Sequence, residues 1–118
     1  MLARFALTGF KSMSDEVLAR LAALIKSRRS AGADQSYTRQ LLDAGLERCT
    51  RKFGEEAIET LVAALAEDDA ALKAEAADLI YHLMVLLEAR NISFDEVVQM
   101  LAGRMGTSGL AEKAQRKP

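Results

Sequence analysis

The chain has 118 residues, of which 50% are hydrophobic and 28% are charged. This length suits one globular domain and is too short for two ordinary ones. The 16 basic and 17 acidic residues leave a net charge of −1, so no overall charge attracts the chain to nucleic acid or to an anionic membrane. Because the only proline is residue 118 and tryptophan is absent, the composition predicts an all-α protein.

The single cysteine, Cys49, excludes an intramolecular disulfide and indicates a reducing compartment. The longest apolar run, residues 76–87, contains Asp78 and His82 and is shorter than the roughly 20 residues that cross a bilayer. The N-terminal residues also lack the uninterrupted apolar segment of a signal peptide. We therefore expect a cytoplasmic protein without a membrane span.

The start of the folded domain is indicated by Ser14, which two acidic residues follow. A serine N-cap and acidic residues in the first turn both favour a helix start. We predict an N-terminal extension over residues 1–13, a domain over 14–105 and a flexible tail over 106–118.

The first half of the domain should contain two long helices separated by a short one. The first runs over residues 15–29, with an apolar stripe formed by Val17, Leu18, Leu21, Leu24 and Ile25. A short helix over 37–44 ends at Gly45, and a long helix follows over 46–66. The apolar positions of this long helix are Leu46, Cys49, Phe53, Ala57, Leu61 and Leu65. Gly54 lowers its stability by about 1 kcal/mol relative to alanine, so we expect another group to approach the backbone there.

The second half should contain two more helices. Asp68 is a suitable N-cap for a third long helix that reaches residue 89. This helix is apolar nearly all round over 76–87, so it needs cover from other helices or from a second subunit. Ser93 and Glu96 form a capping box for a fourth helix, whose buried side should contain Phe94, Val97, Val98, Leu101 and Met105. The expected fold is a bundle of four main helices plus a short one, with its core completed by homodimer formation.

The second long helix carries a group of charged residues on one side. Glu55, Glu56 and Glu59 share about one turn, and Lys52 lies next to them. Like charges three or four residues apart destabilise a helix by a few tenths of a kcal/mol per pair. Lys52 relieves part of this repulsion if it pairs with Glu55 or Glu56. One interpretation is therefore a solvated, salt-bridged helix face.

The third long helix adds Glu75 and Asp78, three residues apart, and His82 one turn further on. A carboxylate in apolar surroundings has to be paired, protonated or bound to a metal. A hydrogen bond between Asp78 and His82 would satisfy those two side chains. It would leave Glu75 and the glutamates of the preceding helix unexplained.

The two acidic pairs, Glu56 with Glu59 and Glu75 with Asp78, are separated by residues 60–74. Consecutive antiparallel helices with a short turn between them would let the pairs face each other. Four carboxylates form a hard-cation site that suits Mg²⁺, which keeps other positions for water and substrate phosphates. One histidine and one cysteine cannot make a zinc site.

Three stretches carry a resemblance to a known family: Ser36-Tyr37-Thr38 followed by Leu41-Leu42, Lys52-Phe53-Gly54-Glu55-Glu56-Ala57, and Ala76-Ala77-Asp78-Leu79-Ile80-Tyr81-His82-Leu83. With the paired acidic motifs, they resemble the all-α, MazG-type nucleotide pyrophosphohydrolases. Within that group the sequence is similar to the phosphoribosyl-ATP pyrophosphohydrolase family of histidine biosynthesis. The likeness covers roughly residues 14–105.

The resemblance implies Mg²⁺-dependent hydrolysis of phosphoribosyl-ATP between its α- and β-phosphates, which gives phosphoribosyl-AMP and pyrophosphate. The implied metal ligands are Glu56, Glu59, Glu75 and Asp78. In this interpretation Glu55 orients or deprotonates the attacking water, and Lys52 neutralises phosphate oxygens. Arg48 and Arg51 share that role with Lys52, or they are ordinary surface cations.

Three further residues have two interpretations each. Tyr37 and Thr38 offer hydroxyl groups for substrate contact, whereas Thr38 or Ser36 could instead cap the short helix. His82, the only histidine, is a candidate general base. Its position among leucine and methionine favours a satisfied core histidine or one that supports the metal ligands.

Two other functions fit parts of the pattern. A house-cleaning pyrophosphohydrolase that acts on ordinary nucleoside triphosphates would have the same acidic pairs, but the Ser-Tyr-Thr stretch and the context of Tyr81 and His82 favour phosphoribosyl-ATP. A non-catalytic helical dimerisation module would explain the apolar third helix. It would give no reason for two matched acidic pairs.

Overall fold

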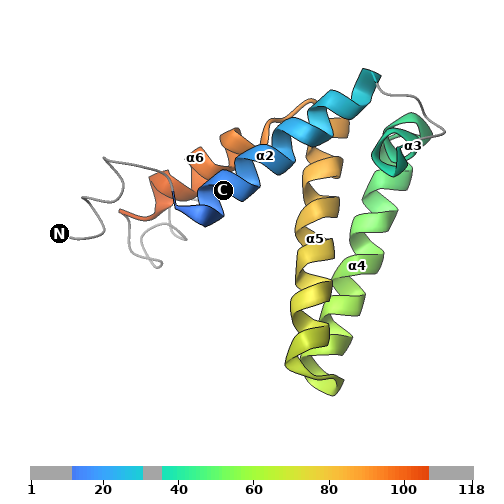
Figure 1. Ribbon diagram of the computed structural model, residues 1–118, viewed down its shortest axis with the longest axis vertical. Coiled ribbons are helices and arrows are strands. Elements are labelled where there is room, and N and C mark those ends of the chain that lie inside the picture. The colour runs from blue at the N-terminus through green and yellow to red at the C-terminus, as the bar shows by residue number, and fades with distance from the viewer. Residues whose placement is uncertain (1–11, 31–35, 107–118) are drawn as a thin grey trace, which may run out of the picture.

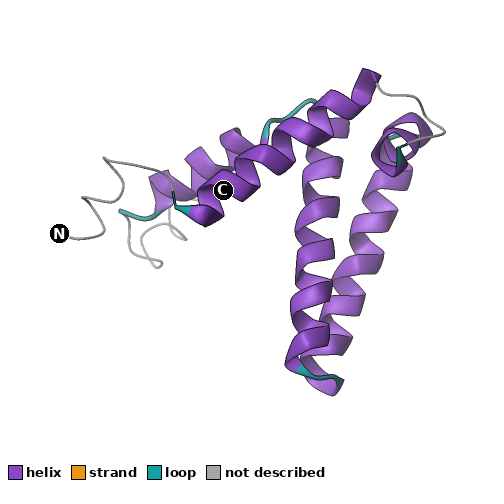
Figure 2. Ribbon diagram, viewed as in Figure 1, coloured by secondary structure: helices purple, strands orange, loops and turns teal. Residues whose placement is uncertain are grey.

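The computed structural model describes residues 12–30 and 36–106, and every regular element in these two ranges is helical (Figure 2). The elements are α2 (Met13–Ser27), the 3-10 turn η1 (Arg28–Ser30), α3 (Tyr37–Ala44), α4 (Leu46–Ala66), α5 (Asp69–Ala89) and α6 (Phe94–Arg104) (Figure 1). The all-α class is therefore confirmed, as are the bounds predicted for α3 and α4. No helix among the described residues is long and apolar enough to cross a membrane.

The first helix begins earlier than expected. Its N-cap is Ser12 and not Ser14, because the Ser12 side chain accepts a hydrogen bond from the Asp15 backbone N–H at 3.2 Å. Both serines precede acidic residues, and the cap falls on the serine that lets the helix include Met13. The predicted extension and tail lie almost wholly outside the described residues, so the division into three segments stays a prediction.

The other helix ends follow from short polar signals. Ser36 caps α3 by accepting from the Arg39 backbone N–H at 3.1 Å, which is the local role considered for it. Asp68 caps α5 by accepting from the Ala71 N–H at 2.9 Å. The capping box of Ser93 and Glu96 at the start of α6 is present as predicted.

Helices α4 and α5 form an antiparallel hairpin, and α2 crosses α5 near its C-terminal half (Figure 1). The buried core lies where α2, α3, α4 and α5 meet and consists of Ile25, Leu41, Cys49, Met84 and Val85. The far half of the hairpin extends away from this core. The acidic residues lie on α4 and α5.

Arg29 fixes the end of α2 and η1 to the end of α5. Its guanidinium donates to the Glu88 carboxylate and main-chain oxygen and, at 3.0 Å, to Oδ1 of Asn91. Asn91 has a positive φ of 59°, a conformation that asparagine tolerates better than most residues after a helix end. These bonds orient α2 relative to the hairpin.

The expected burial of α4 is wrong in part. Cys49 is buried, but Leu61 and Leu65 are 62% and 89% exposed. The face of α4 that meets α5 instead carries Cys49, Glu56 and Ala63. Ile58, Leu61, Val62 and Leu65 form an outward row, which we call the outer stripe of α4.

Helix α6 also differs from the prediction, because Val98, Leu101 and Met105 are exposed. Phe94 and Val97 are half-buried, and Phe94 packs on the core. The helix makes few contacts with α5, and its later apolar residues stay exposed within the described part of the chain. For α5, the expected enclosure is found for His82, Met84 and Val85, whereas Ile80 is exposed.

Candidate active site

The α4–α5 hairpin brings three of the predicted ligands together. Glu56 on α4 and Glu75 and Asp78 on α5 each offer a carboxylate oxygen, and these atoms all lie within 4.8 Å of one another. Glu56 is 9% exposed, Glu75 is half-buried and Asp78 is exposed. The cluster therefore opens to solvent on one side and closes against the hairpin on the other.

Glu59, the fourth predicted ligand, lies beside this cluster and is exposed. It is not one of the three residues whose oxygens meet within 4.8 Å. Its charge is nevertheless near enough to raise the pKa of both Glu56 and Glu75. The structure thus separates a compact group of three carboxylates from a peripheral fourth.

The electrostatics of the cluster disfavour its charged form. Burial raises the pKa of Glu56, and the nearby charges of Glu59 and Asp78 raise it further. Desolvation also raises the pKa of Glu75, with the same two neighbours adding to it. A bound cation would relieve this repulsion, which is the physical reason to test the group as a metal site.

Thr60 fixes the register of the two helices at the level of the cluster. Its hydroxyl lies 2.8 Å from the main-chain oxygen of Glu56 and 3.3 Å from that of Glu75 on the opposite helix. The sequence gives no strong indication of this role for Thr60, because a threonine that bonds to the carbonyl four residues back is common in helices. The only available signal was its place between the two acidic pairs.

Lys52 and Glu55 form an ion pair on the same part of α4, with Nζ and Oε1 3.2 Å apart. This hydrogen bond raises the pKa of Lys52, so the ammonium is retained at neutral pH. Lys52 is one turn before Glu56, which places a cation at the edge of the acidic cluster.

Tyr37 and Thr38 start α3 and have different surroundings. Tyr37 is 51% exposed, whereas Thr38 is buried and shares a hydrogen bond with the Tyr81 hydroxyl. The structure therefore leaves Tyr37 accessible and engages Thr38 with α5. Thr38 does not provide the cap of α3, which is Ser36.

His82 lies on the side of Glu56 toward α3. Its Nε2 is 3.9 Å from Oε1 of Glu56, and both side chains are buried. The rings of Tyr37 and Tyr81 meet the imidazole edge-on, with centroid distances of 6.2 and 4.9 Å. The imidazole is thus one turn of α5 beyond Asp78 and next to the acidic cluster, as a core or supporting histidine would be.

Arg48 and Arg51 are exposed on α4. Arg51 lies in a shallow groove at the α3–α4 junction with Ala44, Leu46 and Thr50. At 100° per residue it is about 140° around the helix from Glu56. The structure thus does not bring Arg51 to the carboxylates, while Arg48 is nearer to their side.

Gly54 does not show the expected close approach. A Cβ placed there meets nothing within 4 Å among the described residues. Nothing in this part of the chain explains why α4 has a glycine at this position.

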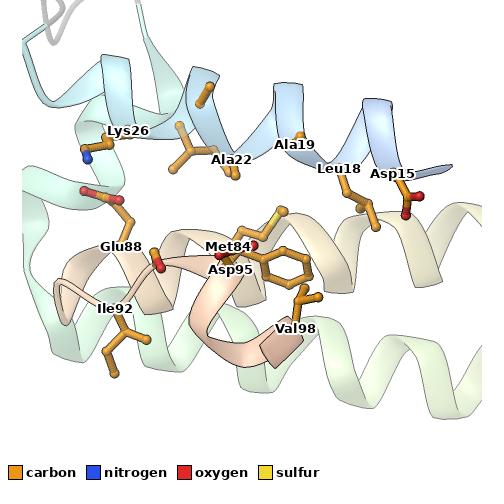
Figure 3. A pocket seen from close by; sticks show the side chains of 14 residues that line it. Asp15, Leu18, Ala19, Ala22, Lys26, Met84, Glu88, Ile92, Asp95 and Val98 are labelled. Atoms are coloured by element: carbon orange, nitrogen blue, oxygen red, sulfur yellow. The ribbon is translucent and has the colours of Figure 1, made fainter. Parts of the chain in front are cut away.

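An apolar cavity lies elsewhere in the described part of the chain. It has a volume of about 450 Å³ and lies between α2, α5 and α6 (Figure 3). Its walls are mainly apolar, with Leu18, Ala22 and Met84 among them, and charged residues stand at its rim. None of the acidic cluster residues lines this cavity. We therefore regard it as an uncovered apolar helix surface and not as part of the candidate active site.

The donors of the cluster fit a divalent hard cation. All three are carboxylate oxygens, and Oε2 of Glu56 is buried without a hydrogen-bond partner among the described residues. Buried polar atoms are rarely left unpaired, and oxygen-rich sites suit Mg²⁺ or Ca²⁺ more than zinc. An all-helical chain with such a cluster has the features of a hydrolase that acts on phosphoanhydrides.

Comparison with known proteins specifies the family. The model of the family described as phosphoribosyl-ATP pyrophosphohydrolase matches residues 18–105. The chain belongs to this family of hydrolases, as the resemblance in three sequence stretches predicted.

Several relatives match over most of both chains. Phosphoribosyl-ATP pyrophosphatase 1 of Bradyrhizobium diazoefficiens is 56% identical over 97 residues, which are 82% of this chain and 92% of the relative. The phosphoribosyl-ATP pyrophosphatase of Cereibacter sphaeroides (strain ATH 2.4.9) is 51% identical over 85% of this chain and 97% of its own length. The enzyme of that name from Rhodobacter capsulatus is 52% identical over 84% and 96%, respectively.

Proposed function

We propose that this chain hydrolyses phosphoribosyl-ATP to phosphoribosyl-AMP and pyrophosphate, the second step of histidine biosynthesis, in a reaction that depends on Mg²⁺. The observation that carries the proposal is the convergence of Glu56, Glu75 and Asp78 within 4.8 Å on the α4–α5 hairpin. The names of relatives that are more than 50% identical support the choice of substrate. The cytoplasm is the proposed location.

Glu56, Glu75 and Asp78 are the proposed Mg²⁺ ligands, with Glu59 as a fourth carboxylate at the edge. A divalent ion held there supplies charge neutralisation for phosphate oxygens and lowers the pKa of water. Carboxylates are well suited to hold Mg²⁺, because this ion prefers oxygen ligands and leaves positions for water and phosphate. The open side of the cluster, at Asp78, gives the substrate a way in.

The chain's own residues then orient and neutralise the substrate. Lys52 would pair with phosphate oxygens, and Arg48 is a second candidate for this role, with Arg51 more remote. Glu55, held near the cluster by Lys52, would orient the water and accept its proton. The water oxygen forms a bond to phosphorus as the bond to the bridging α–β oxygen breaks, so that pyrophosphate and phosphoribosyl-AMP separate.

Tyr37 is the proposed contact for the parts of the substrate outside the triphosphate, because its side chain is accessible at the start of α3 and contacts His82. Thr38 would act on the substrate through Tyr81, since its hydroxyl is already engaged there. These assignments place recognition on α3 and hydrolysis on the α4–α5 hairpin.

A homodimer is also proposed. The outer stripe of α4 presents apolar side chains on the face opposite Glu56, and α6 adds Val98, Leu101 and Met105. Exposed apolar side chains gathered along one helix face are typical of an interface. A second copy covering it would complete the core that a single chain leaves open.

The test is release of pyrophosphate from phosphoribosyl-ATP, measured with and without Mg²⁺ and compared with ATP. A site that uses the added ribose phosphate should lose turnover as well as affinity when this group is missing. We expect ATP to be a poor substrate. Equal kcat/KM values for the two would indicate a general nucleoside triphosphate pyrophosphohydrolase instead.

A further inference from the structure

We propose that His82 is a positioning residue that directs the carboxylate of Glu56 toward Glu75 and Asp78. This inference rests on the proposed function in so far as the carboxylates hold a metal ion. His82 itself is not a ligand in this arrangement. It acts on the site by fixing one oxygen of Glu56, so that the other is presented to the cation.

The first support is the placement of the two side chains. His82 Nε2 is 3.9 Å from Glu56 Oε1, and their side chains are 7% and 11% exposed. His82 follows Asp78 by one turn of α5, and the Glu56 carboxylate is close both to the imidazole and to the other two carboxylates. The proposed hydrogen bond requires the glutamate side chain to turn toward Nε2 and shorten this separation.

The second support is the pattern of unpaired atoms. Among the described residues, Glu56 Oε2 and His82 Nδ1 are the buried side-chain atoms without a hydrogen-bond partner. The atoms that face each other, Oε1 and Nε2, are the other members of the same two groups. One glutamate oxygen therefore faces the imidazole, and the second is free for a cation. Ligating carboxylates are commonly oriented by such an outer hydrogen bond.

The third support is that the imidazole is itself held in place. Tyr37 and Tyr81 contact it edge-on at interplanar angles of 88° and 78°. Tyr81 is fixed in turn by its hydrogen bond with Thr38. With the ring confined between two aromatic side chains, a proton on Nε2 points to Glu56 and lets His82 donate to it. The start of α3 is thereby linked to the metal ligands.

The experiment compares His82→Gln with His82→Asn. The amide nitrogen of glutamine reaches about as far along the side chain as Nε2, whereas that of asparagine reaches only to Nδ1. The readout is the dissociation constant for Mn²⁺, used as a probe for Mg²⁺ and measured by calorimetry without substrate. We expect His82→Asn to weaken Mn²⁺ binding about 10–100-fold and His82→Gln to stay within about threefold of the wild type.

The melting temperature of each variant separates positioning from packing. Both variants remove ring contacts and should lose similar stability, so a difference between them in Mn²⁺ affinity reports the donor alone. Equal affinities in the two variants, whether both normal or both reduced, would overturn the proposal. If either variant fails to fold, the Mn²⁺ affinity of Tyr81→Phe decides: a loss with the fold intact supports the link, and no change overturns it.

The binding readout also keeps the two proposals apart. If wild-type protein binds Mn²⁺ and His82→Asn weakens it, the role of His82 stands even when phosphoribosyl-ATP is not hydrolysed. If phosphoribosyl-ATP is hydrolysed and both variants bind Mn²⁺ equally, the proposed function stands and the role of His82 is excluded.

Discussion

The Thr60 hydroxyl on α4 lies 3.3 Å from the main-chain oxygen of Glu75 on α5, where it bridges the two helices that carry the acidic cluster. It also bonds to the main-chain oxygen of Glu56 at 2.8 Å. Two of the three clustered carboxylates therefore belong to residues whose backbones meet at one side chain. The hydrogen bonds of Thr60 therefore fix both the register of the two helices and the spacing of the carboxylates that they carry.

Thr60→Val should weaken both the hairpin and the metal site, because valine keeps the shape of threonine and removes the donor. We expect a loss of about 1 kcal/mol in the free energy of unfolding, measured by urea denaturation, and a several-fold weaker Mn²⁺ affinity. Thr60→Ser is the matched control, since it keeps the hydroxyl. If Thr60→Val binds Mn²⁺ as tightly as the wild type, the Thr60 hydrogen bonds do not determine the spacing of the three carboxylates.

Asp78→Asn should reduce pyrophosphate release more than Glu59→Gln. Asp78 belongs to the group of three within 4.8 Å, and Glu59 lies outside it. Removing a charge from the group should lower Mg²⁺ affinity without opening a cavity, so circular dichroism should stay helical in both variants. The assay is the Mg²⁺ concentration that gives half-maximal rate. A larger effect of Glu59→Gln would indicate that the metal ion is held mainly by the carboxylates of α4.

Glu56→Gln should stabilise the metal-free protein at neutral pH. A carboxyl whose pKa is raised on folding adds stability that is fully present below its ordinary value of 4.5 and is lost as pH rises through the raised pKa. Glutamine removes this loss. We expect the melting temperature of Glu56→Gln to exceed that of the wild type at pH ~7.5 and to equal it at pH ~4.

Two controls define the Glu56 result. Glu47→Gln changes an exposed glutamate of the same helix and should leave the melting temperature nearly unchanged. Millimolar Mg²⁺ should raise the melting temperature of the wild type by mass action and raise that of Glu56→Gln much less. Thermal shift measurements that show no response of the wild type to Mg²⁺ would favour the salt-bridged helix face.

Lys52→Ala and Tyr37→Phe should affect hydrolysis in different ways. Lys52 is placed to neutralise phosphate, so its loss should lower kcat for phosphoribosyl-ATP and for ATP alike, by roughly 10–100-fold if a charged hydrogen bond of about 1.5–3 kcal/mol is removed. Tyr37→Phe should raise KM for phosphoribosyl-ATP with little effect on ATP. Steady-state kinetics with both substrates distinguishes these patterns, and Mn²⁺ affinity should stay normal in Tyr37→Phe.

Leu61→Lys should produce a monomer if the outer stripe of α4 is an interface. Leu61 is 62% exposed in the single chain, so lysine at this position does not disturb the core. Light scattering should report twice the 12.9 kDa chain mass for the wild type and for Leu61→Met. Monomeric wild-type protein at micromolar concentration would exclude the proposed dimer.

Much of the fold could be predicted because the capping residues in the sequence mark the helix ends that the structure has. Ser93 with Glu96, Asp68 and Gly45 specify helix ends through nearby hydrogen bonds or backbone conformation, and the structure has the helix ends there. Ser12 and Ser14 are both suitable caps, and the choice between them depends on how far α2 extends. Composition predicted the all-α class, and apolar spacing with capping residues predicted the number of helices better than the first residue of each.

The site was harder to define, because helical spacing gives angles around an axis and not the partner that a face meets. Helical spacing placed Glu56 with Lys52 and Glu59 on one side of α4 and predicted that the apolar residues of the opposite side are buried. The structure instead turns Glu56 and Ala63 to α5 and leaves Leu61 outside. Contacts between helices, such as those of Thr60 with Glu75 and Thr38 with Tyr81, have no signal in spacing within one helix.

The α4–α5 hairpin has a kinetic consequence. Its helices are consecutive and their turn is short, so Glu56, Glu75 and Asp78 meet through contacts of low sequence separation, which form early and at little entropic cost. The contacts of α2 with α5 span a longer stretch of chain. Refolding followed by hydrogen exchange should therefore protect the hairpin amides before those of α2, and substitutions at the α2–α5 contact should mainly accelerate unfolding.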